Sequence, residues 1–125
     1  NYAYIGGRSE ELDAYILKAY DMEGNHLLTF GEKGKDGDDW LAYVSQIMEI
    51  PEGFFGIDAN MRDLYIWGPD ASVLGSVEAP DLFGARYAWI AGAAKQDDGS
   101  ILVALTQDRD DDSATELLLY RLSGF

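Results

Sequence analysis

Hydrophobic residues in this chain occur in short runs that are rich in aromatic and β-branched side chains and are separated by turn-forming residues. Runs of this length and composition, repeated at short and regular spacing, are typical of β-strands in an antiparallel protein. We therefore predict ten strands, at Tyr2–Ile5, Ala14–Tyr20, His26–Phe30, Ala42–Ile47, Phe54–Asp58, Asp63–Trp67, Ser72–Val77, Tyr87–Ala91, Ile101–Thr106 and Glu116–Leu122.

The residues between these runs favour tight turns. Segments 22–25, 69–72 and 97–100 combine Gly or Asn, which tolerate positive φ, with Asp or Ser, which bond to their own backbone. A helix is compatible only with Ser9–Lys18 and Trp40–Met48, because glycines elsewhere interrupt any longer helix. The pattern thus predicts an all-β, antiparallel fold.

An aromatic-ended strand, a tight turn and a second strand recur along the chain. This unit occurs at 19–28 and 66–75 and begins again at 119–125. Its aromatic residues Tyr20, Trp67 and Tyr120 are 47 and 53 positions apart. A period near 50 residues matches one four-stranded blade of a β-propeller, whose two apolar faces are buried only when blades stack. The alternative is a sandwich or barrel in which the hairpins are similar by accident.

Two segments resemble known propeller repeats. Segment 51–67 is similar to the NHL-type repeat, which runs Pro-x-Gly, apolar strand, Asp-x-x-Asn-x-Arg and apolar strand, although Asp58 and Asn60 stand one residue closer here. Segment 30–40 resembles part of the bacterial six-bladed propeller lipoproteins, with Asp36-Gly37 in place of Gly-Pro. The resemblance implies a fold of antiparallel propeller-type blades.

The length sets the number of blades. At about 45–50 residues per blade, the 125 residues supply about two and a half to three blades of one domain, in units of approximately 1–35, 36–80 and 81–125. Closed propellers use about 4–8 blades. The chain is then an incomplete ring belonging to a larger propeller, or a homodimer completes a six-bladed ring with Leu117–Leu122 of one copy beside Tyr2–Ile5 of the other. An unrelated small β domain is the third alternative.

Charge and cysteine content narrow the function classes. With 23 acidic and 9 basic residues, the net charge of −14 excludes binding to nucleic acid or to an anionic membrane through a basic face. The absence of cysteine excludes a disulfide framework, a zinc knuckle and a thiol nucleophile. Such acidity is typical of the solvated surface of an exported protein, so we expect a periplasmic or extracellular location. The alternatives are a bound cation or a basic partner.

Candidate chemistry is sparse. The single histidine, His26, falls in a turn-to-strand position, and no serine stands in a Gly-x-Ser-x-Gly elbow, so no catalytic residue is predicted. Six-bladed propeller hydrolases hold calcium in their central channel through Glu, Asn and Asp, and the resemblance implies Asp58 and Asn60 as candidate ligands here. The alternative is that both residues hold a turn through side-chain–backbone bonds.

Aromatic residues supply the remaining candidates. Most of them are expected to fill the space between blades, but Trp40 and Phe83 fall in predicted connecting segments and, with the cation Arg86, are candidate contacts for a partner. The expected function is a non-catalytic, ligand- or protein-binding module of an exported bacterial protein, without a cofactor unless calcium binds. The alternative is a calcium-dependent, lactonase-like propeller hydrolase, assembled from several chains or cut from one.

Overall fold

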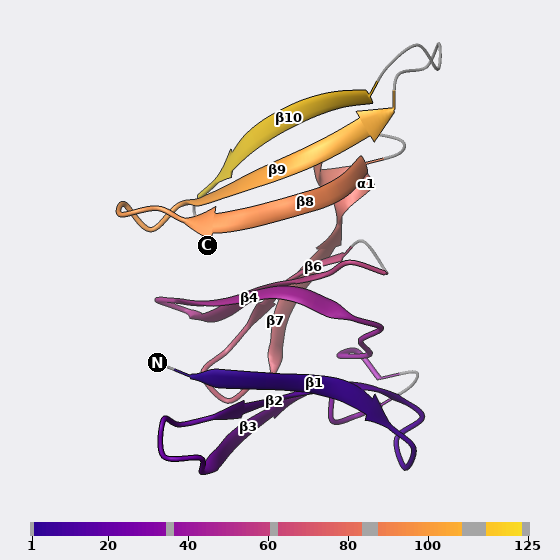
Figure 1. The fold of residues 1–125 in the computed structure, drawn as a ribbon, viewed down its shortest axis with the longest axis vertical. Coiled ribbons are helices and arrows are strands. Elements are labelled where there is room, and N and C mark those ends of the chain that lie inside the picture. The colour runs from indigo at the N-terminus through magenta and orange to yellow at the C-terminus, as the bar shows by residue number, and fades with distance from the viewer. Residues whose placement is uncertain (1, 35–36, 61–62, 84–87, 109–114, 124–125) are drawn as a thin grey trace.

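The chain forms three antiparallel sheets stacked one above another along the long axis of the molecule (Figure 1). The computed structural model describes residues 2–34, 37–60, 63–83, 88–108 and 115–123. The first sheet contains β1 (Ala3–Ser9), β2 (Ala14–Tyr20) and β3 (His26–Phe30). The middle sheet contains β4 (Val44–Ile50), β5 (Gly53–Asp58), β6 (Asp63–Trp67) and β7 (Val73–Glu78). The third sheet contains β8 (Ala88–Lys95), β9 (Ile101–Asp108) and β10 (Thr115–Leu122), in the order β10-β9-β8.

The predicted fold class is confirmed, since the protein is all-β with antiparallel, propeller-type sheets, and the described strands do not close into a barrel. Each of the ten predicted strands overlaps one observed strand. The helical interpretation of Ser9–Lys18 and Trp40–Met48 is wrong, because pairing of β2 with β1 and β3, and of β4 with β5, overrides local propensity. Instead, a short helix α1 (Ala79–Phe83) connects β7 to β8. In the part of the chain described, no helix has the length and apolar character needed to cross a membrane.

Three aspartates form the turns between paired strands. Asp21, Asp70 and Asp98 each accept a hydrogen bond from the backbone N–H of a residue two positions further on, at 2.9–3.1 Å. Side-chain bonds from Asn25, Ser72 and Ser100, with these backbone bonds, lower the pKa of the three carboxyls. Because the folded state favours the ionised form, this stabilisation is present above the ordinary carboxyl pKa of about 4 and is lost as the pH falls.

The middle sheet is apolar on both faces, as its strand alternation requires. Phe54 and Trp67 point toward the first sheet, where they pack with Leu17 and Phe30. The intervening Phe55 and the other residues of the opposite face pack against the third sheet and α1 in a cluster of Ile50, Phe55, Ile57, Leu64, Ala79, Phe83, Ile101, Val103 and Leu105. The core therefore consists of two layers, one on each side of this sheet.

Trp67 lies at the centre of the first layer and is fully buried. Its ring stacks on Tyr65, with centroids 5.1 Å apart, and meets Phe30 edge-on at 5.0 Å. The ring also lies over the backbone of Gly56, where a Cβ atom would be only 2.3 Å from its Cζ3 atom. A side chain at position 56 would therefore displace Trp67.

A second buried group, the carboxylate of Asp58, holds the segment that leads into β4. Its Oδ2 accepts the N–H of Ala42 at 2.6 Å, and its Oδ1 accepts those of Tyr43 and Asn60 at 3.1 Å each. Tyr65 adds to this attachment by donating its hydroxyl to the carbonyl of Trp40 at 3.2 Å. Burial raises the pKa of Tyr65 to about 12, so the hydroxyl remains a donor at neutral pH. Residues 40–43 are thus fixed against the end of the middle sheet.

We expect Gly56→Ala to lower the free energy of unfolding by about 1–3 kcal/mol, because the new methyl group overpacks the core against Trp67. Urea denaturation followed by tryptophan fluorescence measures the change. Gly75→Ala in the same sheet is the matched control, since no atom lies within 4 Å of its Cβ position. Equal losses in the two variants would show that the contact with Trp67 does not constrain position 56.

Replacing the carboxylate in Asp58→Asn is expected to destabilise the fold by about 2–3 kcal/mol, because the charged acceptor is lost and an amide donor faces backbone N–H groups. Asn60→Ala is the control. Asn60 is exposed, and among the described contacts it joins this network through its backbone N–H, so the change should stay within about 0.5 kcal/mol. Thermal unfolding of both variants tests the assignment, which fails if Asp58→Asn melts at the wild-type temperature.

Candidate binding site

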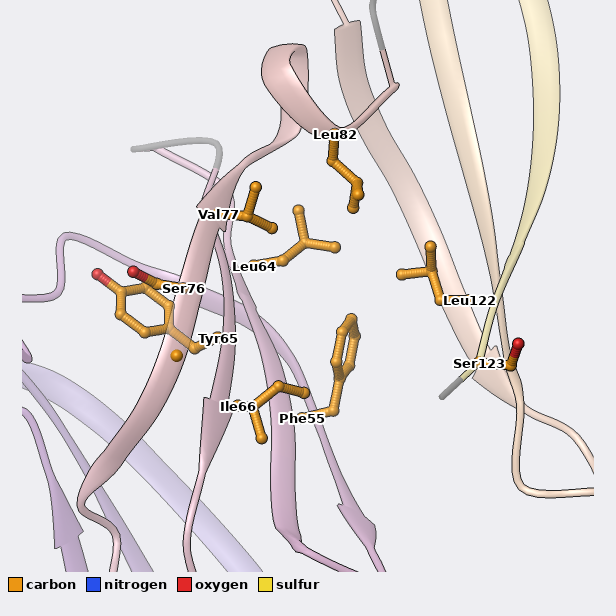
Figure 2. Close-up of a pocket in the computed structure, with 10 residues that line it drawn as sticks. Phe55, Leu64, Tyr65, Ile66, Ser76, Val77, Leu82, Leu122 and Ser123 are labelled. Atoms are coloured by element: carbon orange, nitrogen blue, oxygen red, sulfur yellow. The ribbon is translucent and has the colours of Figure 1, made fainter. Parts of the chain in front are cut away.

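A pocket of about 320 Å³ opens between the middle and third sheets (Figure 2). Strands β5, β6, β7 and β10 and helix α1 contribute to it. We call it the inter-sheet pocket, and its lining residues are Phe55, Leu64, Tyr65, Ile66, Gly75, Ser76, Val77, Leu82, Leu122 and Ser123. It is a candidate binding site, because apolar concavities of this size accept apolar groups.

Strand alternation determines which side chains face the pocket. Leu64 pairs with Val77 and Ile66 pairs with Gly75, so these four positions share one face of β6 and β7. The residues between them, Tyr65 and Ser76, point away from it in Figure 2. The lining is therefore aliphatic and aromatic, and Gly75 deepens it because no atom lies within 4 Å of its Cβ position.

The mouth of the inter-sheet pocket is open to solvent. Val77 at the end of β7 is 37% exposed, and Leu82 on α1 is 42% exposed. Leu122 bounds the pocket from β10 on the opposite side (Figure 2). Such a site binds by removing apolar surface from water, which contributes about 25 cal/mol per Å². Its described lining supports binding and orientation of a ligand.

The candidate calcium ligands Asp58 and Asn60 lie at the end of β5, on the far side of the middle sheet from the inter-sheet pocket. Both carboxylate oxygens of Asp58 accept backbone N–H groups, as the turn-holding alternative requires, and Asn60 is exposed. Within the described ranges, no group of three or more His, Asp or Glu side chains is arranged to hold a metal ion.

The three candidate contact residues do not converge on one site. Trp40 is half-buried and lines a separate hollow of about 260 Å³ between the first sheet and residues 40–42, beside the ion pair of Arg8 with Asp13. Phe83 is buried on α1, with its ring 4.7 Å from that of Tyr120, so it fills the core as most aromatics were expected to do. The third, Arg86, lies outside the described residues.

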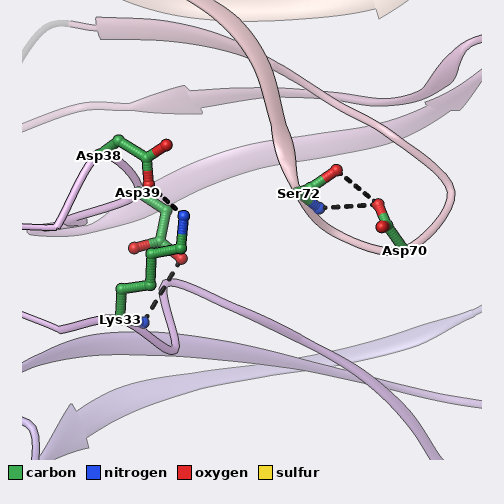
Figure 3. A network of polar contacts seen from close by, with 5 residues as sticks. All are labelled: Lys33, Asp38, Asp39, Asp70 and Ser72. Carbon is green, nitrogen blue, oxygen red and sulfur yellow. Dashed lines mark hydrogen bonds and ion pairs between the residues drawn. The ribbon is translucent and has the colours of Figure 1, made fainter.

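The acidic segment before Trp40 is partly neutralised within its own loop (Figure 3). Lys33 places its Nζ 2.7 Å from Asp38 Oδ1, and its backbone N–H donates to Asp39 Oδ2 at 3.5 Å. The bond and charge of Asp38 raise the pKa of Lys33. Asp39 is buried and its Oδ1 has no hydrogen-bond partner among the described atoms. These contacts shape the loop that covers the middle sheet.

Sequence reasoning did not identify the inter-sheet pocket. Its lining comes from segments that read as ordinary strand residues, and only the spatial order of the strands brings Val77 and Leu122 together. One local signal was present: Pro80 suits the first turn of a helix and marks the start of α1, which carries Leu82.

A scan against protein-family models found no match to this chain, and a search of curated proteins found none either.

Proposed function

We propose that this protein is a non-catalytic, propeller-type interaction module of an exported bacterial protein, and that it binds other β-sheets through the outer faces of its first and third sheets. The observation that carries the proposal is the apolar character of these two outer faces. The acidic composition and the resemblance to bacterial propeller repeats support the exported location.

The outer face of the first sheet exposes hydrophobic side chains around a hollow. Leu17 and Ala19 point into the core, so the alternate residues Ile16, Lys18 and Tyr20 point outward. On the neighbouring strand β1, Ile5 is 64% exposed. These residues, with the glycines of β1, line a depression of about 260 Å³.

The outer face of the third sheet is similarly apolar. Leu117 and Leu119 on β10 are 68% and 64% exposed. Register places Leu119 beside Ala104 of β9, which in turn pairs with Gly92 of β8. No atom lies within 4 Å of the Cβ position of Gly92, so this part of the face is flat and open.

Contact with a further sheet would bury these faces as the middle sheet is buried. The covered face of β5 likewise sets a large residue, Phe54, next to a small one, Gly56. Exposed apolar patches mark interaction sites when they are large. A second copy supplies a matching surface, since its first sheet can stack on the third sheet of its partner and so extend the series of sheets toward a closed ring.

We expect light scattering on a sizing column to show a mass above that of one chain, rising with protein concentration. Ile5→Lys and Leu119→Lys should each reduce this mass, because a buried ammonium group opposes stacking. Met22→Lys is the control, since it adds the same charge at an exposed turn. A monomer at every concentration, or equal association of the three variants, would contradict the proposal.

A further inference from the structure

The third sheet is one strand narrower than the middle sheet, and β10 forms its edge. Strand β8 of the third sheet faces β4 of the middle sheet. The two are linked by Lys95 of β8, whose Nζ donates to the carbonyl of Glu49 on β4 at 3.1 Å. Next, β9 packs its Val103 and Leu105 against the β5 side of the core, and β10 places Leu122 beside the pocket formed by β6 and β7. Among the strands described, β7 therefore has no counterpart in the third sheet.

The inter-sheet pocket lies where that counterpart would run. Its floor is formed by β6 and β7, through Leu64, Ile66 and Val77, and β10 bounds it with Leu122. Figure 2 shows Leu64, Ile66 and Val77 on one side of the pocket and Leu122 on the other. Among the described strands none pairs with the outer edge of β10, and Leu122 of β10 borders the apolar pocket.

On the opposite face of the middle sheet, other residues of the chain cover β6. There Leu41 forms a β-bridge with Tyr15 of β2 in the first sheet. Leu41 is buried in that layer, and Trp40 is bonded through its carbonyl to the hydroxyl of Tyr65 on β6. Thus β6 is covered by the chain on one face and borders an open pocket on the other.

We propose that the β10 edge and the inter-sheet pocket together form a binding site for an extended peptide strand of a partner protein, which pairs its backbone with β10 and inserts alternate apolar side chains between Ile66, Val77 and Leu122. Addition of a strand to an exposed sheet edge combines main-chain hydrogen bonds with side-chain pockets at alternate positions. Both elements are present here.

Charge selects the kind of strand that binds. Asp81 is exposed on α1 next to Leu82 of the pocket, and the chain carries a net charge of −14, so a basic group at the end of a bound strand is attracted to this site. Glu78 pairs with Asp63 of β6 and lies on the opposite face of the middle sheet. The partner strand is therefore apolar at alternate positions and carries Lys or Arg at its end.

This inference is separate from the proposed stacking of the outer faces. It uses the edge of β10 and its inward-facing neighbours, whereas stacking uses Leu117 and Leu119 on the outer face of the same strand. Either can fail while the other holds.

The test uses the peptide KTVTVTVK, which alternates valine with threonine between terminal lysines, in a chemical-shift titration of the isotope-labelled protein. We expect saturable binding with a Kd below about 1 mM, with the largest shifts in β10, β7 and α1. Gly75→Val fills the pocket without a clash, since no atom lies within 4 Å of its Cβ position, and should weaken binding at least tenfold. Gly7→Val, equally uncrowded but on β1, is the control and should bind as the wild type does.

Two modified peptides test the strand pairing itself. One is N-methylated at its threonines and the other at its valines, so that each loses the N–H groups of one edge. Only the version methylated on the edge facing β10 should lose binding, by at least tenfold. No binding of the unmodified peptide, unchanged binding by Gly75→Val, or equal binding of the two methylated peptides would overturn the proposal.

A second copy of this chain is the rival occupant. If light scattering shows a dimer that Gly75→Val dissociates, the rival is correct and the proposal is wrong. Ile5→Lys and Leu119→Lys separate this outcome from the outer-face stacking, because both variants leave the inter-sheet pocket intact and should bind the peptide normally. Unfolding of Gly75→Val in urea at or above the wild-type midpoint confirms that the variant is folded.

Discussion

Burial of both faces of the middle sheet is the constraint on which the rest of the structure depends. Because residues alternate along β5, Phe54 and Phe55 point in opposite directions and each needs its own covering layer. A single additional sheet would leave one of these aromatic faces in water. The first and third sheets satisfy the two faces separately, and in doing so each presents an outer face of its own. Apolar side chains on these outer faces, such as Ile5 on one side and Leu119 on the other, remain exposed to water.

Close packing in the first layer shows how specific this burial is. Trp67 is held between Tyr65 and Phe30, and it fits only because Gly56 brings no side chain. The carboxylate of Asp58 then fixes residues 42–43 over the same face through the backbone N–H groups of Ala42 and Tyr43. In the second layer, the described residues leave a pocket open beside Leu122 of β10. The two faces of the middle sheet are thus covered to different extents, and the candidate site lies on the less covered face.

Strand positions were predictable from the sequence because they depend on local alternation and on turn residues. Asp21, Asp70 and Asp98 each mark a turn that is recognisable without any knowledge of tertiary contacts. The helical alternative for Ser9–Lys18 is wrong because pairing on both edges of β2, which decides the structure there, is a non-local property. The burial of Phe83 and the pocket between Val77 and Leu122 were equally hidden, since both depend on which strands face each other across two sheets.

The acidic surface and the apolar faces act in opposite directions on association. Two copies that stack through their outer faces bring together two net charges of −14, and this repulsion opposes the burial of leucine and isoleucine. Salt screens the repulsion over about 10 Å at 0.1 M, so stacking gains from ionic strength. A basic strand paired with β10 gains instead from the carboxylate of Asp81 and from the negative charge of the chain, an attraction that the same salt weakens. The two modes of binding therefore have opposite salt dependence, and at low ionic strength the charge of this protein favours a basic partner strand over a second copy of itself.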